Sequence, residues 1–207
     1  MRNNHLPNLL LIFFLSFQLA SPAAIIDSIP KGWRATLETS PDVIMGIDTI
    51  IKRSGRASGF IKRLPIESNG YGTMMQSIEA NEYRNKMVRI SVYVKCKDVE
   101  RGGLYFRVDG KETALRHTYS SKQYIEETMD WTLFQLTLDV PEESRNIDFG
   151  ATLVGEGTLW LDDYKLEVVE KTTADDNMIT EESKTRKLPI RNYLPNKKAI
   201  NLGFEEL

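Results

Sequence analysis

The sequence predicts an all-β protein, built as a two-sheet antiparallel β-sandwich of the jelly-roll type, and three observations support this fold class. Short apolar runs rich in β-branched and aromatic residues recur between turn signals from residue 33 to residue 169. Sustained helical periodicity is almost absent from this region. Apolar and polar side chains alternate along most of the runs, as in strands that bury one face. Strands without intervening helices pack most economically as two facing sheets.

The expected strands follow one another along the chain. The turn 54–57 separates the first two, and Asp109-Gly110 is the clearest hairpin signal because this pair suits a tight two-residue turn. The glycines of 155–157 join the last two strands. The expected strands cover 43–52, 58–64, 71–78, 87–96, 103–108, 111–118, 131–140, 147–154 and 158–168.

Residues 1–23 are predicted to be a signal peptide. Arg2 precedes the apolar run 9–15, and the small residues of 21–24 form a cleavage-site pattern with cleavage expected after Ala23. The apolar run is too short to span a bilayer, and no later run of about 18 apolar residues follows. We therefore expect an exported protein, periplasmic or extracellular, without a membrane span.

Composition divides the rest of the chain into three parts. The β-sandwich domain is expected over 24–169, because the charged, Thr-rich stretch that follows reads as a polar linker over 170–199. Residues 200–207 alternate between apolar and polar side chains, as an added edge strand would. This terminal tail is expected either to fold back onto the domain or to link it to a partner.

Charge and reactive residues exclude several classes of function. The formal net charge is −2, so nucleic acid is not an expected partner. Cys96 is the single cysteine and continues an apolar row, which predicts a buried side chain and no disulfide. Once the signal peptide is removed, His117 is the remaining histidine, and its position predicts a solvated surface residue. These residues supply neither a zinc cluster nor a convincing catalytic triad, so the protein is expected to be noncatalytic.

The alternation also predicts a ligand platform. If the strands 87–96 and 103–108 share a sheet, its exposed face shows Tyr93, Tyr105 and Arg107. Tyrosine rings suit the apolar faces of sugars, and Arg107 together with the amide of Gln76 would hydrogen-bond hydroxyl groups. The alternative is that tyrosine and arginine are ordinary occupants of exposed strand positions.

Adjacent acids stand near the middle of the last expected strand. Strand alternation places Asp162 and Asp163 on opposite sides of the sheet, so one of them faces inward. A buried carboxylate needs several hydrogen-bond donors or a cation. The pair therefore predicts either a polar anchor for the strand or a ligand of a structural metal.

Six segments of the expected domain follow one another in a recognisable order. They are Pro30–Trp33, Ser54–Ser58, Tyr83–Ser91, Gly103–Gly110, Asp130–Thr132 and Leu159–Asp163. Together they resemble a bacterial domain of the galactose-binding-like superfamily and, more distantly, the carbohydrate-binding modules of cellulases and xylanases. The resemblance covers most of 30–169 and implies a sandwich that binds sugars, other ligands or nothing known. It also implies that copies occur alone or attached to hydrolases and transcription regulators.

The resemblance also implies a structural calcium. In those modules an Asn-x-x-Phe-Glu segment opens the domain, and its Glu joins an Asp of the last strand around the ion. Here the matching segment, Asn201–Glu205, stands at the carboxyl end, as in a circular permutation. Asp162 or Asp163 and Glu205 would then hold calcium, with the remaining oxygens supplied by the backbone or water.

Two functional hypotheses follow. The first is an exported, noncatalytic module that binds a glycan or another small polar ligand on the Tyr93, Tyr105 and Arg107 face or at the adjoining loops. The second is a protein–protein or scaffold module that docks onto a secreted enzyme or envelope component, using residues 201–207 for strand addition. A small hydrolase is a third, weaker interpretation.

Overall fold

The computed structural model describes residues 29–36, 39, 41–63, 70–120, 124–171 and 193–207. In these residues the regular elements are strands and no helix occurs, which confirms the all-β prediction. The expected signal peptide, residues 1–23, lies outside the described residues. The strands are β1 (Arg34–Ala35), β2 (Val43–Asp48), β3 (Ser58–Arg63), β4 (Tyr71–Glu79), β5 (Lys86–Asp109), β6 (Ala114–Tyr119), β7 (Ile125–Val140), β8 (Asn146–Val154) and β9 (Gly157–Val169).

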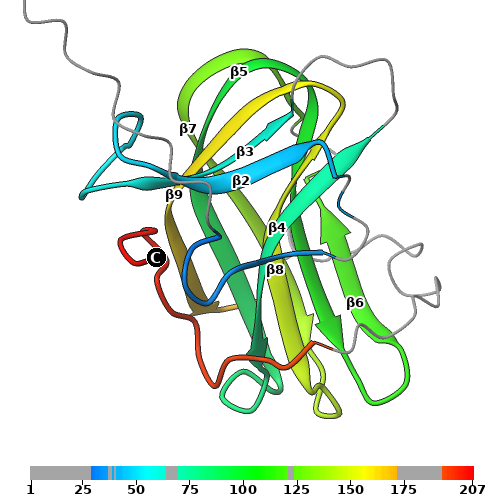
Figure 1. Ribbon diagram of the computed structural model, residues 1–207. Helices are drawn as coiled ribbons and strands as arrows, with labels where there is room; N and C mark the ends of the chain where they lie inside the picture. The colour runs from blue at the N-terminus through cyan, green and yellow to red at the C-terminus, as the bar shows by residue number, and fades with distance from the viewer. Residues whose placement is uncertain (1–28, 37–38, 40, 64–69, 121–123, 172–192) are drawn as a thin grey trace, which may run out of the picture.

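The strand β5 belongs to both sheets and organises the sandwich. Its first half pairs antiparallel with β7 and β9, and its second half pairs antiparallel with β8 and β6. Register shifts between Val94 and Gly102 mark the bend, which Figure 1 shows curving over at one end of the molecule. The first sheet is therefore ordered β2-β3-β9-β5-β7 and the second β1-β4-β8-β5-β6.

This bend corrects one expectation. The sequence predicted separate strands over 87–96 and 103–108, whereas both belong to the single strand β5. The intervening residues keep ladder contacts, including Val99 with Glu127 and Gly102 with Ile125. Two halves of one strand thus lie in two different sheets, so the residues on them do not share one face.

The core lies between the sheets and matches the predicted inward rows. Val88, Ile90, Val92 and Val94 of the first half of β5 are buried with Leu104, Phe106 and Val108 of its second half. Cys96 continues the first row as a buried free thiol, as predicted. Because the apolar side chains of these rows are buried between the sheets, the hydrophobic effect stabilises the packing of one sheet on the other.

The carboxyl-terminal tail, residues 193–207, packs against the sandwich. Asn196 forms a parallel bridge with Ile78 of β4, although residues 193–199 were assigned to the polar linker. The Phe204 ring is 0% exposed and stacks on Trp33 with 4.7 Å between ring centroids. Gly59 leaves room for this ring, since a Cβ there would lie 2.5 Å from it. The tail therefore closes the domain instead of extending from it (Figure 1).

The tail does this as a loop, so the expected edge strand over 200–207 is wrong. Asn201 and Phe204 have left-handed φ angles of 50° and 57°, which break an extended backbone. The Asn201 side chain bonds the backbone of Glu206 in both directions, and Phe204 N–H donates to the Asn201 carbonyl. These local bonds use groups that an edge strand would present to a neighbour.

Candidate functional site

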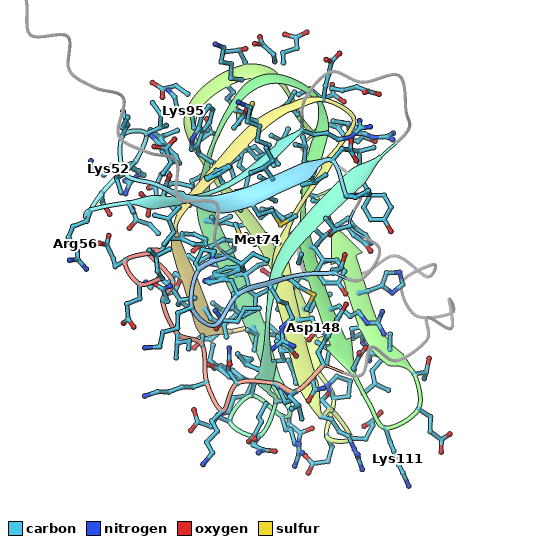
Figure 2. The ribbon with its side chains drawn as sticks, in the orientation of Figure 1. Lys52, Arg56, Met74, Lys95, Lys111 and Asp148 are labelled. Atoms are coloured by element: carbon cyan, nitrogen blue, oxygen red, sulfur yellow. The ribbon has the colours of Figure 1, made fainter. Side chains whose placement is uncertain are left out.

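The outer face of the second sheet carries a layer of polar side chains from four neighbouring strands. Alternation turns the apolar residues of β8 and β5 inward and leaves their polar residues on the other side. Every member of the layer is buried. The layer consists of Ser77 of β4, Asp148 of β8 (Figure 2), Arg107 and Asp109 of β5, and His117 of β6.

Arg107 is the centre of this polar layer. It is the direct cross-strand neighbour of Asp148 on one side and of His117 on the other. Its Nε donates to Asp109 Oδ1 at 2.5 Å, and both side chains are 2% exposed. Burial alone would lower the pKa of Arg107, but the Asp109 hydrogen bond and the nearby charges, including that of Asp148, raise it overall. The guanidinium is therefore a fixed, permanent charge.

Two buried polar atoms of the layer retain unused hydrogen-bonding capacity. Among the described residues, neither Asp109 Oδ2 nor Ser77 Oγ has a hydrogen-bond partner. A buried group left in this way costs about 1–3 kcal/mol, so such atoms are uncommon unless a ligand or water uses them. The layer is therefore able to accept and donate additional hydrogen bonds.

Tyrosines accompany the charges on the same face. The buried Tyr105 ring packs against Tyr119 at 5.4 Å, and Tyr119 is 44% exposed. Tyr71 stands exposed on β4, in the outward row that continues to Ser77. A partly exposed ring on the face that carries buried charges is an arrangement suited to a hydroxyl-rich molecule.

The predicted platform does not form as expected. Tyr105 and Arg107 do share this face, but both are buried, whereas the sequence predicted them to be exposed. Tyr93 lies on the outer face of the first sheet, because β5 bends between Tyr93 and Tyr105. The Arg53 guanidinium covers the Tyr93 ring at 3.5 Å from its centroid, so that face of the ring is already occupied.

Gln76 and His117 also differ from expectation. Gln76 points into the sandwich, where Nε2 donates to the Ile200 carbonyl at 2.9 Å and Oε1 accepts the Ile200 N–H at 2.8 Å. It therefore holds the tail and does not face a ligand. His117 was predicted to be solvated, but it is buried beside Tyr119. Asp109, Asp148 and Ser77 were missed as site residues, although strand alternation places Asp109 on the same side as Arg107 and Asp148 opposite the apolar row of β8.

Asp162 is the polar anchor that the sequence offered as one alternative. Its Oδ2 accepts the backbone N–H groups of Arg53 at 2.9 Å and Ser54 at 3.1 Å, and its Oδ1 accepts the N–H of Asp163 at 2.8 Å. Burial raises the pKa of Asp162 although these three donors oppose the shift. The carboxylate ties β9 to the loop between β2 and β3.

Asp163 reaches the same loop, so the predicted opposite orientation of the two acids is wrong. Asp163 has a φ of 53°, and the β5–β9 register shifts at this point. This local bulge removes the strict alternation on which the prediction depended. The Asp163 carboxylate accepts from Arg53 Nη1 at 2.5 Å and from Ser54 Oγ at 2.7 Å.

The donor set does not fit the calcium that the resemblance implied. Glu205 accepts the Arg56 backbone N–H at 2.9 Å and the Arg56 Nε at 3.1 Å, at the loop tip that Figure 2 shows beside the tail. Asp162, Asp163 and Glu205 thus face N–H groups and two arginines, while calcium needs six to eight oxygens. No cluster of three or more His, Cys, Asp or Glu side chains suited to a metal occurs in the described part of the chain.

The chain is similar in sequence to a curated protein. No protein-family model matches the sequence. The chain is 34% identical over 151 residues to the uncharacterized HTH-type transcriptional regulator YbfP of Bacillus subtilis, covering 72% of this chain and 51% of the regulator. The chain therefore spans about half the length of the curated relative that it matches.

Solved structures are similar in fold at low sequence identity. The enzymatically active domain of tailspike protein 4 from bacteriophage CBA120 is 10% identical with a TM-score of 0.54, covering 69% of this chain and 20% of the tailspike chain. The CBM22-1 xylan-binding domain of Paenibacillus barcinonensis Xyn10C is 14% identical with a TM-score of 0.48, covering 72% and 93%. A carbohydrate-binding module is thus among the similar structures, while the predicted β-sandwich is confirmed by the two sheets that the described strands form.

Within the described residues, no helix has the length and apolar character needed to cross a bilayer.

Proposed function

We propose that this chain is an exported, noncatalytic module that binds a glycan or another small polar ligand on the outer face of its second sheet. The observation that carries the proposal is the buried Arg107–Asp109 pair, with Asp109 Oδ2 lacking a partner among the described residues. A buried pair of this kind is weak evidence for a stabilising role, because well-packed apolar residues often stabilise a fold at least as well. Its position on the same face as the partly exposed Tyr119 favours recognition.

The arrangement indicates how such a ligand would be held. One ring of an oligosaccharide would lie against Tyr119, whose side chain is partly exposed. Because Asp109 Oδ2 and Ser77 Oγ are buried, hydroxyl groups of the neighbouring ring would reach them through bridging water. Because Arg107 is fixed by Asp109, little side-chain entropy would be lost on binding.

The curated relative supports a role without bond breakage. A transcriptional regulator needs reversible binding to sense a signal, and the described residues of this chain contain no helix that could form a helix-turn-helix. The scaffold hypothesis loses its proposed docking strand, because Phe204 is committed to the core of its own domain.

The test is calorimetric titration of the purified chain with a panel of soluble oligosaccharides. We expect saturable binding to one glycan class, with no release of new reducing ends. Tyr119→Ala should weaken binding roughly tenfold, as the loss of one stacking contact does. Tyr93→Ala, the same substitution on the opposite face, is the matched control and should bind normally. No binding across the panel, or equal loss in both variants, would overturn the proposal.

Export is tested separately. Expression with the native amino terminus should yield a processed protein outside the cytoplasm, with the new terminus at Ala24. An unprocessed chain retained in the cytoplasm would contradict the predicted export without affecting the ligand-binding test.

A further inference from the structure

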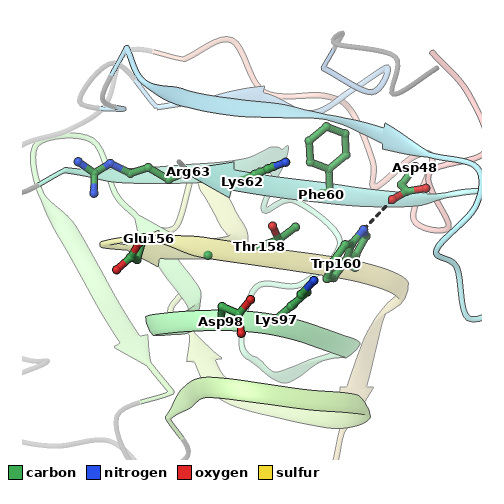
Figure 3. Close-up of a pocket in the computed structure, with 10 residues that line it drawn as sticks. Asp48, Phe60, Lys62, Arg63, Lys97, Asp98, Glu156, Thr158 and Trp160 are labelled. Atoms are coloured by element: carbon green, nitrogen blue, oxygen red, sulfur yellow. Dashed lines mark hydrogen bonds between the residues drawn. The ribbon is translucent and has the colours of Figure 1, made fainter. Parts of the chain in front are cut away.

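A hollow lies on the outer face of the first sheet, on the opposite side of the sandwich from the polar layer. Its volume is about 400 Å³, within the size range of small-molecule sites. Strands β2, β3, β5 and β9 contribute side chains to it, as Figure 3 shows. Trp160 lies at one end of it, while Asp98 and Glu156 lie on the side away from Trp160.

Strand register fixes two rows of side chains in this hollow. Thr158 of β9 is the cross-strand neighbour of Lys62 on β3 and of Lys97 on β5. Two residues further along β9, Trp160 is the cross-strand neighbour of Phe60 on β3 and of Lys95 on β5. The Cα atoms of Lys62 and Lys97 are therefore two strand spacings apart, roughly 10 Å. A hydroxyl flanked by two lysines thus stands directly beside an indole ring.

The indole is held in place by a carboxylate. Trp160 Nε1 donates to Asp48 Oδ2 at 2.8 Å, as the dashed line in Figure 3 marks. Asp48 Oδ1 accepts the backbone N–H groups of Ile50 at 2.8 Å and Ile51 at 2.9 Å. Phe60 is buried next to the indole. The half-buried ring is therefore preorganised, which reduces the entropy lost when a ligand stacks on it.

The two lysines differ from the other basic residues nearby. Arg63 is paired with Asp42 and Lys95 with Asp130. Within the described part of the chain, neither Lys62 nor Lys97 forms an ion pair. Two like charges on one face repel unless an anion lies between them. The Asp98 carboxylate, the nearest acid in sequence, accepts a hydrogen bond from Thr128 at 3.3 Å.

We propose that this hollow binds an acidic saccharide, a sugar ring that carries a carboxylate. The ring stacks on Trp160, the carboxylate lies between the ammonium groups of Lys62 and Lys97, and the Thr158 hydroxyl donates to the same anion. Indole faces suit the C–H face of a sugar, and ammonium groups make the strong hydrogen bonds that a carboxylate accepts. This site is independent of the polar layer around Arg107.

The test is titration of the chain with tri-galacturonate, monitored by tryptophan fluorescence and by calorimetry. The same trisaccharide with its carboxyl groups reduced to alcohols is the matched ligand, and inorganic phosphate is the simple anion. We expect saturable binding of the acidic sugar that weakens as salt rises, because exposed charges are screened. The reduced sugar and phosphate should each bind at least roughly tenfold more weakly, since each lacks one of the two contacts.

Two variants test the site, and two others serve as controls. Trp160→Ala and the double variant Lys62→Met/Lys97→Met should each lose at least roughly tenfold in affinity. Lys111→Met/Lys165→Met removes the same two charges elsewhere and should bind normally. A thermal melt of each variant verifies that it is folded, and Tyr119→Ala should leave this titration unchanged. Equal binding of the acidic and reduced sugars, or equal loss in both lysine double variants, would overturn the proposal.

Discussion

Asp162 and Asp109 are two buried carboxylates in different regions of the sandwich, and they are treated very differently by their surroundings. Asp162 is 0% exposed and accepts three backbone N–H groups at the end of the molecule closed by the tail. Asp109 is 1% exposed on the outer face of the second sheet, with one oxygen bound to Arg107 and the other without a partner among the described residues. The two carboxylates are therefore equally buried, but Asp162 has hydrogen-bond donors for both of its oxygens and, within the described part of the chain, Asp109 has a donor for one.

This difference separates two roles that burial alone does not. A carboxylate whose oxygens already accept from backbone N–H groups has no acceptor left for a ligand. Removing such a carboxylate destabilises the fold, because the buried N–H groups lose their hydrogen-bond partner. A carboxylate with a spare oxygen costs stability in the empty protein and recovers that cost when a ligand donates to it. We therefore assign Asp162 to the fold and Asp109 to the binding face.

The largest expected effect on stability comes from Phe204→Ala, which removes a buried ring of the tail at the end of the molecule that contains Asp162. The ring is fully buried against Trp33 and Tyr164, so its loss leaves a cavity and should reduce the free energy of unfolding by about 3–5 kcal/mol. Urea denaturation followed by tryptophan fluorescence measures this. Leu194→Ala, at an 87% exposed position of the same tail, is the control and should change little. If both variants unfold like the wild type, the tail does not close the fold.

The second effect is that of Asp162→Ala. Three N–H donors lose their acceptor, so the free energy of unfolding should fall by about 2–3 kcal/mol while ligand titrations of the surviving folded protein remain unchanged. Asp163→Ala is the matched neighbour. Its carboxylate is partly exposed and its ion pair with Arg53 lies at the surface, so it should cost about 1 kcal/mol or less. Equal losses would show that Asp162 is not a distinct anchor.

Asp109→Asn should give the reverse pattern. Arg107 keeps the charge of Asp148 beside it, and the amide oxygen still accepts from the guanidinium, so the loss of stability should stay below the roughly 3–5 kcal/mol that a broken buried ion pair costs. Glycan affinity should fall roughly tenfold, because the amide lacks the charged acceptor that a sugar hydroxyl would use. Calorimetry and urea denaturation of the same sample measure the two quantities. Full affinity in this variant would remove Asp109 from the site.

Much of the fold was predictable because it depends on periodicity. The rows Val88–Val94 and Leu104–Val108 alternate regularly, and these inner faces are buried as expected. The bend of β5 was not predictable, since its register shifts keep ladder pairing through residues that resemble a loop. That single bend moved Tyr93 to the face opposite Tyr105 and Arg107.

The candidate sites were harder to predict than the fold for the same reason. Strand alternation identifies which residues share a side of one strand, but it does not specify which strands become neighbours. Thr158 is a candidate site residue because Lys62 and Lys97 are its cross-strand neighbours. Both lysines lie far from it in sequence, and strand register alone brings them together. At Asp163 the bulge reversed the alternation itself, so the reasoning failed locally where the backbone is left-handed.

A smaller effect concerns pH and the same anchor. Burial raises the pKa of Asp162 above its ordinary value of 3.8, so the folded state holds this proton more tightly than the unfolded state does. The resulting contribution to stability is complete below the ordinary pKa and is lost as pH rises through the raised pKa. Asp162→Asn removes this contribution. The difference in unfolding free energy between wild type and variant, measured by urea denaturation at successive acidic pH values, should therefore change over that window. A pH-independent difference would contradict the raised pKa.

The smallest expected effect is the response to calcium, which should be close to zero. A calcium ion at Asp162, Asp163 and Glu205 would have to displace N–H donors and approach the guanidinium groups of Arg53 and Arg56, both of which repel a cation. Since an ion that binds only the folded state raises its stability by mass action, calcium and EDTA should leave the melting temperature unchanged. The double variant Arg53→Gln/Arg56→Gln gives a more sensitive test. It removes the two positive charges that pair with Asp163 and Glu205, so these carboxylates become available to a cation. A calcium-dependent rise in that variant alone would show that arginines occupy the place of the ion, whereas a saturable rise in the wild type would contradict the assignment of these acids to a metal-free anchor.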